Sequence, residues 1–443
     1  MLIACILGSV IVFVDSTVVN VALPAIQRDL GGGLVLQQWV VDAYLLTLGS
    51  LLLVGGSLGD LFGERKLFAL GIAAFGVTSV LCAAAPDGTV LILARGLQGV
   101  AGAILTPAGL AVIAHTFSGE ERGAAIGSWT AWTGVAFVIG PVVGGWLVTH
   151  ASWRWVFLIN VPFAIATLLL VLYAVPKREQ TEARAKVDVV GGVLCMVGLG
   201  GPVFALIEQP RRGWGDALIV GTLGGGLALF AVFLWWERTS SHPMLPLKLF
   251  SRRNFSFANL ETFTIYAGLS TLTFFLVLFL QQLAGYKALD SGLALLPVTL
   301  VMFTLSPRVG RLSMRIGPRV FMGFGPFIAA VGLVALIRLK PGFNYWVELL
   351  PPLLVFSVGL SMIVAPLTAT VLADAGERDS GIASGINNAV ARVAGLLGIA
   401  VVGVSVAGSG KNLDMSGFRL AMGITAGLVA CGGVIGLVGI RNR

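Results

Sequence analysis

The amino-acid sequence predicts an all-α membrane protein that crosses the bilayer many times. Hydrophobic residues make up 57% of the 443 residues, charged residues only 11%, and the mean hydropathy is +0.94. A soluble domain carries roughly 25% charged residues. The 59 glycines stand largely within apolar runs, where small residues let membrane helices approach closely. These observations exclude an ordinary soluble protein.

Long apolar runs define the expected membrane helices. A spanning helix needs ~20 mostly apolar residues, and about fourteen runs satisfy this requirement. Polar or turn-forming breaks such as Arg28–Gly31, Pro86–Gly88 and Lys340–Gly342 separate them. The expected spans are 2–24, 37–58, 67–86, 89–115, 122–149, 154–176, 187–208, 216–236, 254–282, 291–309, 319–338, 346–372, 381–407 and 417–440.

The formal net charge of +8 has a topological explanation. Nucleic-acid binding would need a basic patch on a soluble face, and no such segment is visible, so no nucleic-acid partner is expected. With the N-terminus inside, the inner loops hold roughly twice as many Lys and Arg residues as the outer loops. The bias predicts a multi-pass protein of the cell inner membrane with both termini in the cytoplasm.

A repeated segment indicates two related halves. The stretch Gly56–Arg65 reads GSLGDLFGER and the stretch Gly310–Arg319 reads GRLSMRIGPR, with Gly, Leu, Gly and Arg at one constant offset. Each follows the second helix of its half. The spacing predicts an N-terminal six-helix bundle over 1–176, a linker with two extra helices over 177–253, and a C-terminal six-helix bundle over 254–443.

Several motifs occur together along the chain. The first helix reads VDSTVVNVALP over Val14–Pro24, and the fourth reads RGLQG over Arg95–Gly99. The fifth reads GPVVGG over Gly140–Gly145, and WRWVFLINVP over Trp153–Pro162 opens the sixth. With the loop after the second helix, this set resembles the major facilitator superfamily, and within it the fourteen-helix drug:proton antiporters.

The resemblance implies a fold and a function. It implies two bundles around a central cavity that opens alternately to each side, and proton-driven export of drugs or other lipophilic, often cationic, small molecules. The expected partners are the substrate, protons and membrane lipid, and the expected state is a monomer. Export of a lipid or metabolite, uptake by symport, and a membrane sensor or scaffold without transport are the alternatives.

Three charged residues inside apolar runs are the candidates for proton coupling: Asp15, Arg95 and Glu261. Burial favours the neutral form of a carboxyl group, which suits a group that loads and releases protons. A buried guanidinium needs a carboxylate or carbonyl partner, and Asp15 is a candidate for Arg95. Protonation of Asp15 would then free Arg95 for exchange with substrate; a static interhelical ion pair is the alternative.

The resemblance also assigns a gating loop and an antiporter motif. The gating loop comprises Gly56, Asp60, Gly63, Arg65 and Lys66, where Asp60 and Arg65 would form a charge relay that stabilises the outward-open state. Leu61 and Glu64 replace two basic positions of the family pattern. The antiporter motif comprises Gly140, Pro141, Gly144 and Gly145, which are expected to let the fifth helix bend and approach the other half.

Substrate contacts are the least constrained expectation. Asp42 stands near Trp39 and Tyr44 and is expected at the membrane interface, with substrate contact as the alternative. Trp129, Trp132 and Tyr266 are candidates to bind flat cations through their ring faces. Arg392 is expected to be structural.

No enzyme chemistry is expected. The segment Gly408–Asn412 resembles the end of a phosphate-binding loop, but Ser405 and Asn412 break the pattern, so no ATP site is expected. The histidines His115, His150 and His242 lack metal-ligand spacing, and no catalytic triad is visible. The expectation is therefore a non-enzyme without cofactor, driven by the proton gradient.

Overall fold

The computed structural model describes residues 1–117, 119–175, 187–406 and 412–442, and the described elements are helical. Within these residues, thirteen helical segments are long and apolar enough to cross a bilayer. Helix α5, with 32 residues over the expected run 122–149, adds one more. The sequence-based prediction of about fourteen spans in an all-α membrane protein is therefore confirmed.

The first seven helices form the N-terminal part of the bundle. Each of the helices α1 to α5 is long enough to cross a membrane. The short α6 continues into α7, and together they make the single span Trp155–Ala174. Their bounds are α1 (Leu2–Leu30), α2 (Gly33–Phe62), α3 (Glu64–Ala84), α4 (Gly88–Thr116), α5 (Gly119–His150), α6 (Trp155–Leu158) and α7 (Asn160–Ala174).

Two helices follow as a hairpin, and the remaining elements form the C-terminal part. Gly376, with φ 78°, interrupts α14, so that η3 and the first part of α14 make the span Tyr345–Gly376 and the second part makes the span Asp379–Val406. The bounds are α8 (Val189–Arg212), α9 (Ala217–Thr239), η1 (Leu247–Ser251), α10 (Arg253–Leu278), η2 (Phe279–Leu283), α11 (Ala288–Ala294), α12 (Leu296–Ile316), α13 (Pro318–Leu336), η3 (Tyr345–Leu349), α14 (Leu350–Val406) and α15 (Met415–Gly439).

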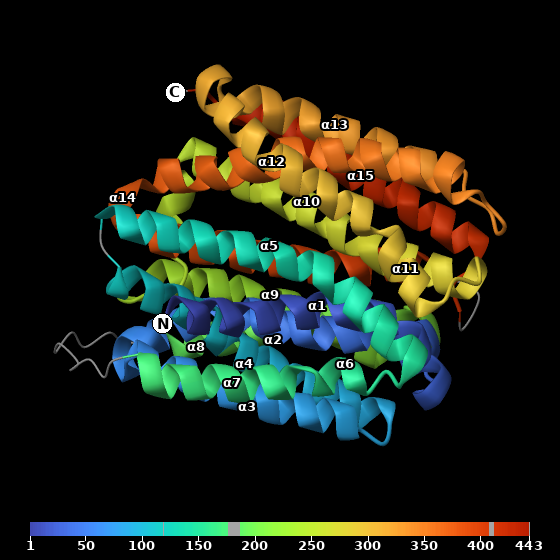
Figure 1. The fold of residues 1–443 in the computed structure, drawn as a ribbon, viewed down its shortest axis with the longest axis horizontal. Coiled ribbons are helices and arrows are strands. Elements are labelled where there is room, and N and C mark those ends of the chain that lie inside the picture. The colour runs from blue at the N-terminus through green and yellow to red at the C-terminus, as the bar shows by residue number, and fades with distance from the viewer. Residues whose placement is uncertain (118, 176–186, 407–411, 443) are drawn as a thin grey trace.

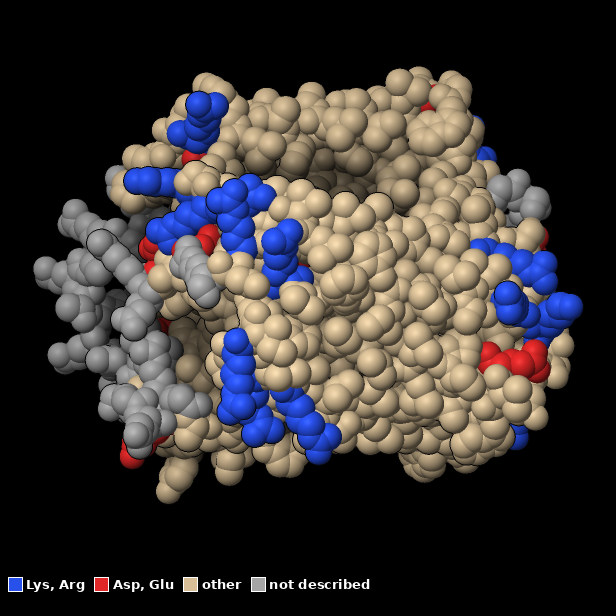
Figure 2. Space-filling model, turned by 90° about the horizontal axis from the view of Figure 1, so that it is seen from above, with Lys and Arg blue, Asp and Glu red and all other residues tan. Residues whose placement is uncertain are grey.

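Figure 1 shows the long helices running side by side, with α1 to α7 in one half and α10 to α15 in the other. Both chain ends lie at the same end of the molecule. Figure 2 shows Lys and Arg gathered at the two ends, more densely at the end of the chain termini, with a broad uncharged band between them. A band of this kind is what a bilayer requires, because hydrocarbon does not solvate charge.

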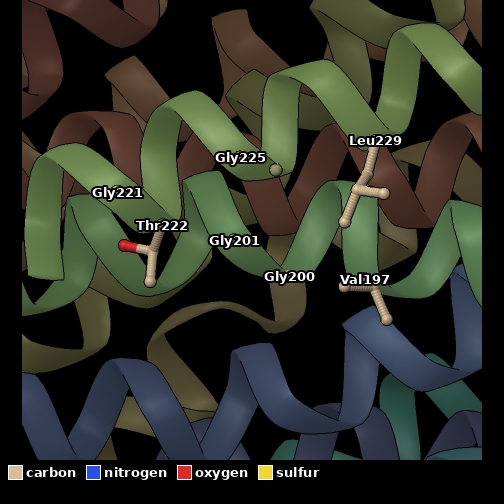
Figure 3. Close-up of a pocket in the computed structure, with 8 residues that line it drawn as sticks. Val197, Gly200, Gly201, Gly221, Thr222, Gly225 and Leu229 are labelled. Carbon is tan, nitrogen blue, oxygen red and sulfur yellow. The ribbon is translucent and has the colours of Figure 1, made fainter.

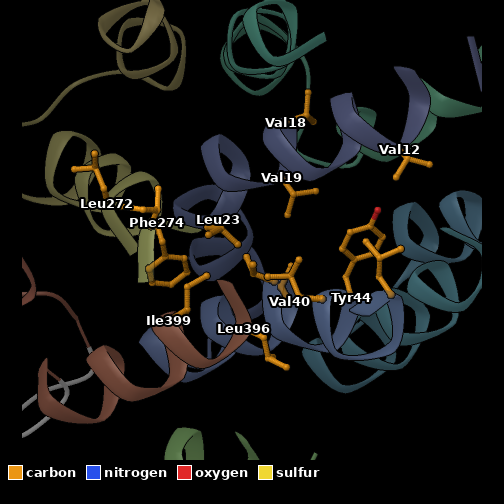
Figure 4. Packing of buried hydrophobic residues seen from close by; sticks show 14 of the residues in the cluster. Val12, Val18, Val19, Leu23, Val40, Tyr44, Leu272, Phe274, Leu396 and Ile399 are labelled. Carbon is orange, nitrogen blue, oxygen red and sulfur yellow. The ribbon is translucent and has the colours of Figure 1, made fainter. Parts of the chain in front are cut away.

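Apolar side chains pack where the halves meet. Leu23 of α1 and Val40 of α2 lie close to Leu272 and Phe274 of α10 and to Ile399 of α14, and all are nearly or fully buried (Figure 4). The α8–α9 hairpin packs outside this core against α2 and the second span of α14. Glycines of α8 and α9 let the two helices approach, and they line a groove of about 360 Å³ (Figure 3).

Candidate functional site: a buried polar network

Four helices bring five polar side chains together inside the N-terminal half. Asp15 comes from α1, Ser79 from α3, Arg95 and Gln98 from α4, and Asn160 from α7. Arg95 and Gln98 are three residues apart, so one face of α4 presents both. Each of the five is at most 2% exposed, so the network lies in the bundle interior.

The hydrogen bonds satisfy both oxygens of Asp15. Nη1 of Arg95 lies 2.7 Å from its Oδ2, and Oδ1 accepts from Nε2 of Gln98 at 3.0 Å and from Nδ2 of Asn160 at 2.9 Å. Gln98 also donates to the Ser79 hydroxyl at 2.9 Å and accepts from Nη1 of Arg95 at 2.6 Å. A buried ion pair is tolerated only when such additional hydrogen bonds accompany it.

The guanidinium of Arg95 has two further contacts from α2. Its Nε donates to the backbone oxygen of Val40 at 3.0 Å, and its Cζ lies 4.2 Å from the ring centroid of Tyr44. The ring face stabilises the cation where no water reaches it. Arg95 therefore joins α4 to α1 and α2, and a change in the charge of Asp15 would act on the packing of all three helices.

Sequence reasoning found the Asp15–Arg95 pair but missed Ser79, Asn160 and Tyr44 as members of its surroundings. Asn160 stands within the motif Trp153–Pro162, which is the signal that could have indicated it. The idea that substrate takes the place of Arg95 beside Asp15 does not fit this conformation, because Asp15 is 0% exposed.

Glu261 does not join this network. It lies in α10 of the other half, is 0% exposed, and neither carboxyl oxygen has a hydrogen-bond partner among the residues that the structure describes. Thr264, one turn along α10, lies against Gly432 of α15, which places this face of α10 inside the C-terminal half. Glu261 is thus an isolated buried carboxyl group, separate from the Asp15–Arg95 pair.

Asp42, which was expected at the membrane interface, is buried inside the protein. Asp42 is 0% exposed, and its oxygens have no partner within the described part of the chain. Its α2 face carries Gln38, which donates to the backbone oxygen of Ile399 in α14. Trp39 donates to Glu208 of α8 at 2.9 Å, so the hairpin covers this part of α2. The sequence gives no indication of that cover.

The gating loop and its second copy have equivalent geometry. Gly63 ends α2 with φ 88°, and Gly317 ends α12 with φ 99°, conformations that favour glycine. Arg65 donates to the backbone oxygen of Leu172 in α7, and Arg319 donates to that of Leu437 in α15. In each half, the arginine of the repeated segment therefore contacts the last span of that half.

Other members of the gating loop contribute less. Lys66 is exposed at the beginning of α3, and a Cβ at Gly56 would only make an ordinary contact with Pro107 of α4. Asp60 lies in the last turn of α2, but its side chain is outside the described residues, so the proposed charge relay stays a prediction.

The antiporter motif faces two neighbours rather than one. A Cβ at Gly140 would collide with Thr17, and one at Gly144 would lie 3.1 Å from Val18, both in α1 of the same half. Gly145 instead faces the backbone of α11 in the other half, at 2.6 Å from the Ala288 oxygen. The expected approach to the other half is thus made by Gly145, while two glycines pack within the N-terminal half.

The three aromatic candidates lie in different environments. Trp129 is partly buried and donates through Nε1 to the Ser9 hydroxyl at 2.8 Å, whereas Trp132 is 53% exposed. Tyr266 of α10 is partly buried. Residues 407–411, which include most of the phosphate-loop-like segment, lie outside the described residues. Within the described residues, no group of three His, Cys, Asp or Glu side chains is placed to hold a metal ion.

Comparisons with known proteins agree with this architecture. The profile of the Major Facilitator Superfamily matches residues 5–399. The chain is 37% identical to an uncharacterized MFS-type transporter, EfpA, of Mycobacterium tuberculosis over 88% of this chain and 73% of the relative. It is 36% identical to the puromycin resistance protein of Streptomyces alboniger, over 90% and 80% respectively, and 33% identical to the methylenomycin A resistance protein of Bacillus subtilis, over 97% and 92%.

Solved structures show the same fold at low sequence identity. The partially occluded inward-open xylose transporter XylE of E. coli matches with a TM-score of 0.65 and 13% identity, over 99% of this chain and 95% of its own.

Proposed function

Because this chain belongs to the major facilitator superfamily, a family of transporters rather than enzymes, we propose that it exports drug-like small molecules in exchange for protons. Relatives at 33–36% identity are named for resistance to puromycin and methylenomycin A, which supports drugs as the substrate class. The two-bundle arrangement supports alternating access, in which the halves rock about a central site.

The buried Asp15–Arg95 pair is the observation that carries the proton-coupling proposal. The pair occupies the middle of α1 and the first half of α4, and both oxygens of Asp15 accept hydrogen bonds, from Arg95, Gln98 and Asn160. Protonation would remove the anion that compensates a fully buried guanidinium, which is strongly unfavourable without rearrangement. We propose that this penalty changes the packing of α1 against α4, and that the proton acts through helix positions rather than by direct exchange with substrate.

The contacts between the halves support an inward-facing state. Within the described residues, the hydrogen bonds between the halves lie toward the end opposite the termini: Gln27–Asn412, Gln27–Gln282, Gln38–Ile399, Gln281–Val21 and Leu289–Thr149. We propose that both termini are cytoplasmic, as the Lys and Arg distribution predicts, so that this closed end is the outer end.

We propose bundles over 1–176 and 254–443 with a two-helix linker over 177–253, a monomer in the cell inner membrane, and no cofactor beyond the proton gradient. Glu261 is the second candidate for a proton site. One charge crossing 100 mV releases about 2.3 kcal/mol, which exceeds the ~1.4 kcal/mol needed for a tenfold substrate gradient.

Everted membrane vesicles test the proposed direction and energy source. Acidifying the vesicle interior should drive uptake of puromycin or methylenomycin A into vesicles with the wild-type chain. Nigericin, which collapses the pH gradient, should abolish that uptake, and Asp15→Asn vesicles should resemble vesicles without the protein. Uptake that persists after nigericin would contradict proton coupling, and substrate that leaves together with protons would indicate symport.

A further inference from the structure

The accessible charge between the two halves is positive. Six charged side chains of the described residues stand about seven or more positions from either end of a span: Asp15, Asp42, Arg95, Glu261, Arg308 and Arg392. Asp15, Asp42 and Glu261 are 0% exposed and Arg95 is 1% exposed. Arg308 of α12 and Arg392, midway along the second span of α14, are the members that keep accessible surface, and both are positive. A solute that enters between the halves therefore meets a guanidinium and not a carboxylate.

Arg392 stands where helices of both halves meet. Its Cζ lies 5.5 Å from the ring centroid of Phe13 in α1, and a Cβ at Gly49 of α2 would lie 3.2 Å from its Cβ. Ser270 of α10 lies against Gly395, one turn further along α14. Tyr266, one turn before Ser270 in α10, lies within electrostatic range of Arg392. Three helices besides α14 thus surround this side chain.

The guanidinium of Arg392 is not compensated by a counter-ion. Within the described part of the chain, no carboxylate lies within 4.0 Å of it and no oxygen accepts a hydrogen bond from it. Arg95, by contrast, donates hydrogen bonds to a carboxylate, a backbone carbonyl oxygen and a side-chain amide oxygen. A cation within a membrane protein requires compensation, and the five N–H donors of a guanidinium suit planar oxyanions.

We propose that Arg392 is an anion-recognition site, which binds the acidic group of an amphiphilic organic anion while the apolar part of that solute packs against Phe13 and Tyr266. This inference rests on the proposed transport function and names its substrate class. It differs from the expectation of lipophilic cations, because the carboxylates that would attract a cation are fully buried. The nearby Ser270 hydroxyl offers a further hydrogen bond to such a solute.

Two hydrophobic ions of the same size and opposite charge provide the test. Tetraphenylborate and tetraphenylphosphonium are titrated into the purified full chain in an uncharged detergent. Binding is measured by calorimetry against micelles alone. The wild type should bind tetraphenylborate at least about tenfold more tightly than tetraphenylphosphonium, because the charge of Arg392 attracts the first ion and repels the second.

Matched variants assign the preference to Arg392. Arg392→Gln should lose it, Arg392→Lys should keep most of it, and Arg338→Gln, which removes one exposed positive charge outside the spans, should leave it unchanged. Equal or tighter binding of tetraphenylphosphonium by the wild type, no binding of either ion, or an Arg392→Gln variant that behaves like Arg338→Gln would overturn the proposal. The wild-type comparison decides even if Arg392→Gln fails to fold. Binding of the two ions to the protein in detergent needs no proton gradient. A negative result in this assay is therefore distinct from a failure of proton-coupled transport.

Discussion

Replacing Asp15 by asparagine should destabilise the protein through the guanidinium of Arg95. Asparagine has nearly the same shape, and its oxygen can still accept from Gln98 and Asn160. Its amide nitrogen would then replace Oδ2, which lies 2.7 Å from Nη1 of Arg95, and two donors would face each other. Arg95, 1% exposed, would keep the Val40 carbonyl, the Gln98 oxygen and the rings of Tyr44 and Phe157, none of which carries a negative charge.

The magnitude follows from the burial of the pair. Removing one partner of a buried ion pair costs about 3–5 kcal/mol, because the other charge remains without compensation. Asp15→Asn should therefore lower the free energy of unfolding by about 3–5 kcal/mol. The double variant with Arg95→Gln should lose less than the sum of the two single variants, because it no longer contains an uncompensated buried charge.

Unfolding by titration with a denaturing detergent, followed by tryptophan fluorescence, measures this loss. Asp29→Asn is the matched control: Asp29 pairs with Arg154 at 2.6 Å, but the side chains are 46% and 37% exposed, so its removal should have little effect. If Asp15→Asn costs no more than Asp29→Asn, or if the double variant shows simple additivity, the account of a compensated buried charge is wrong.

Three further predictions concern packing, backbone conformation and pH. Gly99→Ala should lower the free energy of unfolding by about 1–3 kcal/mol, because the new Cβ would collide with Thr47 and the Tyr44 backbone. Gly96→Ala on the same helix, with nothing within 4 Å of the new Cβ, should be neutral or slightly stabilising. Thermal unfolding of the two variants tests this difference. Gly63→Ala should destabilise by about 1–3 kcal/mol, because φ is 88°, and a midpoint equal to wild type would contradict this. Asp414, which precedes the α15 span, accepts hydrogen bonds from the Gly417 N–H and the Ser416 hydroxyl, and these lower its pKa. The contribution of Asp414 to stability should be complete above the pKa of an unfolded Asp, ~4, and should be lost as pH falls through the lower pKa of the folded state. Hydrogen exchange in the first turn of α15, corrected for intrinsic rates, should rise only in that lower pH range.

The membrane helices could be predicted because length and apolarity alone decide them. Each expected run coincides with a helical span, since hydrocarbon excludes an unpaired backbone and leaves helix as the solution for an apolar segment. The equivalence of the gating loop and its second copy also followed from the sequence. Gly63 and Gly317 both have a positive φ, a conformation that favours glycine and can be expected from the local sequence alone.

Partners across helices could not be predicted in the same way. Ser79 and Asn160 are small polar residues in apolar runs, and only the packing of α3 against α4 and of α7 against α1 brings them to the Asp15–Arg95 pair. The burial of Asp42 could not be predicted for a related reason: its neighbours Trp39 and Tyr44 suggested an interface, but Trp39 hydrogen-bonds to α8 and Tyr44 lies over Arg95. Both neighbours are held by helices distant in the sequence, since Glu208 lies more than a hundred positions from Trp39.

The most direct test of the central claim is proton movement triggered by substrate. Proteoliposomes that contain the protein and a pH-sensitive dye, with no imposed gradient, receive puromycin or methylenomycin A on one side. We expect wild-type protein to move protons opposite to the substrate and Asp15→Asn to move none. The Glu261→Gln variant, measured beside them, tests whether a second carboxyl group contributes. Proton movement that survives in Asp15→Asn at the wild-type rate would contradict coupling through the Asp15–Arg95 pair.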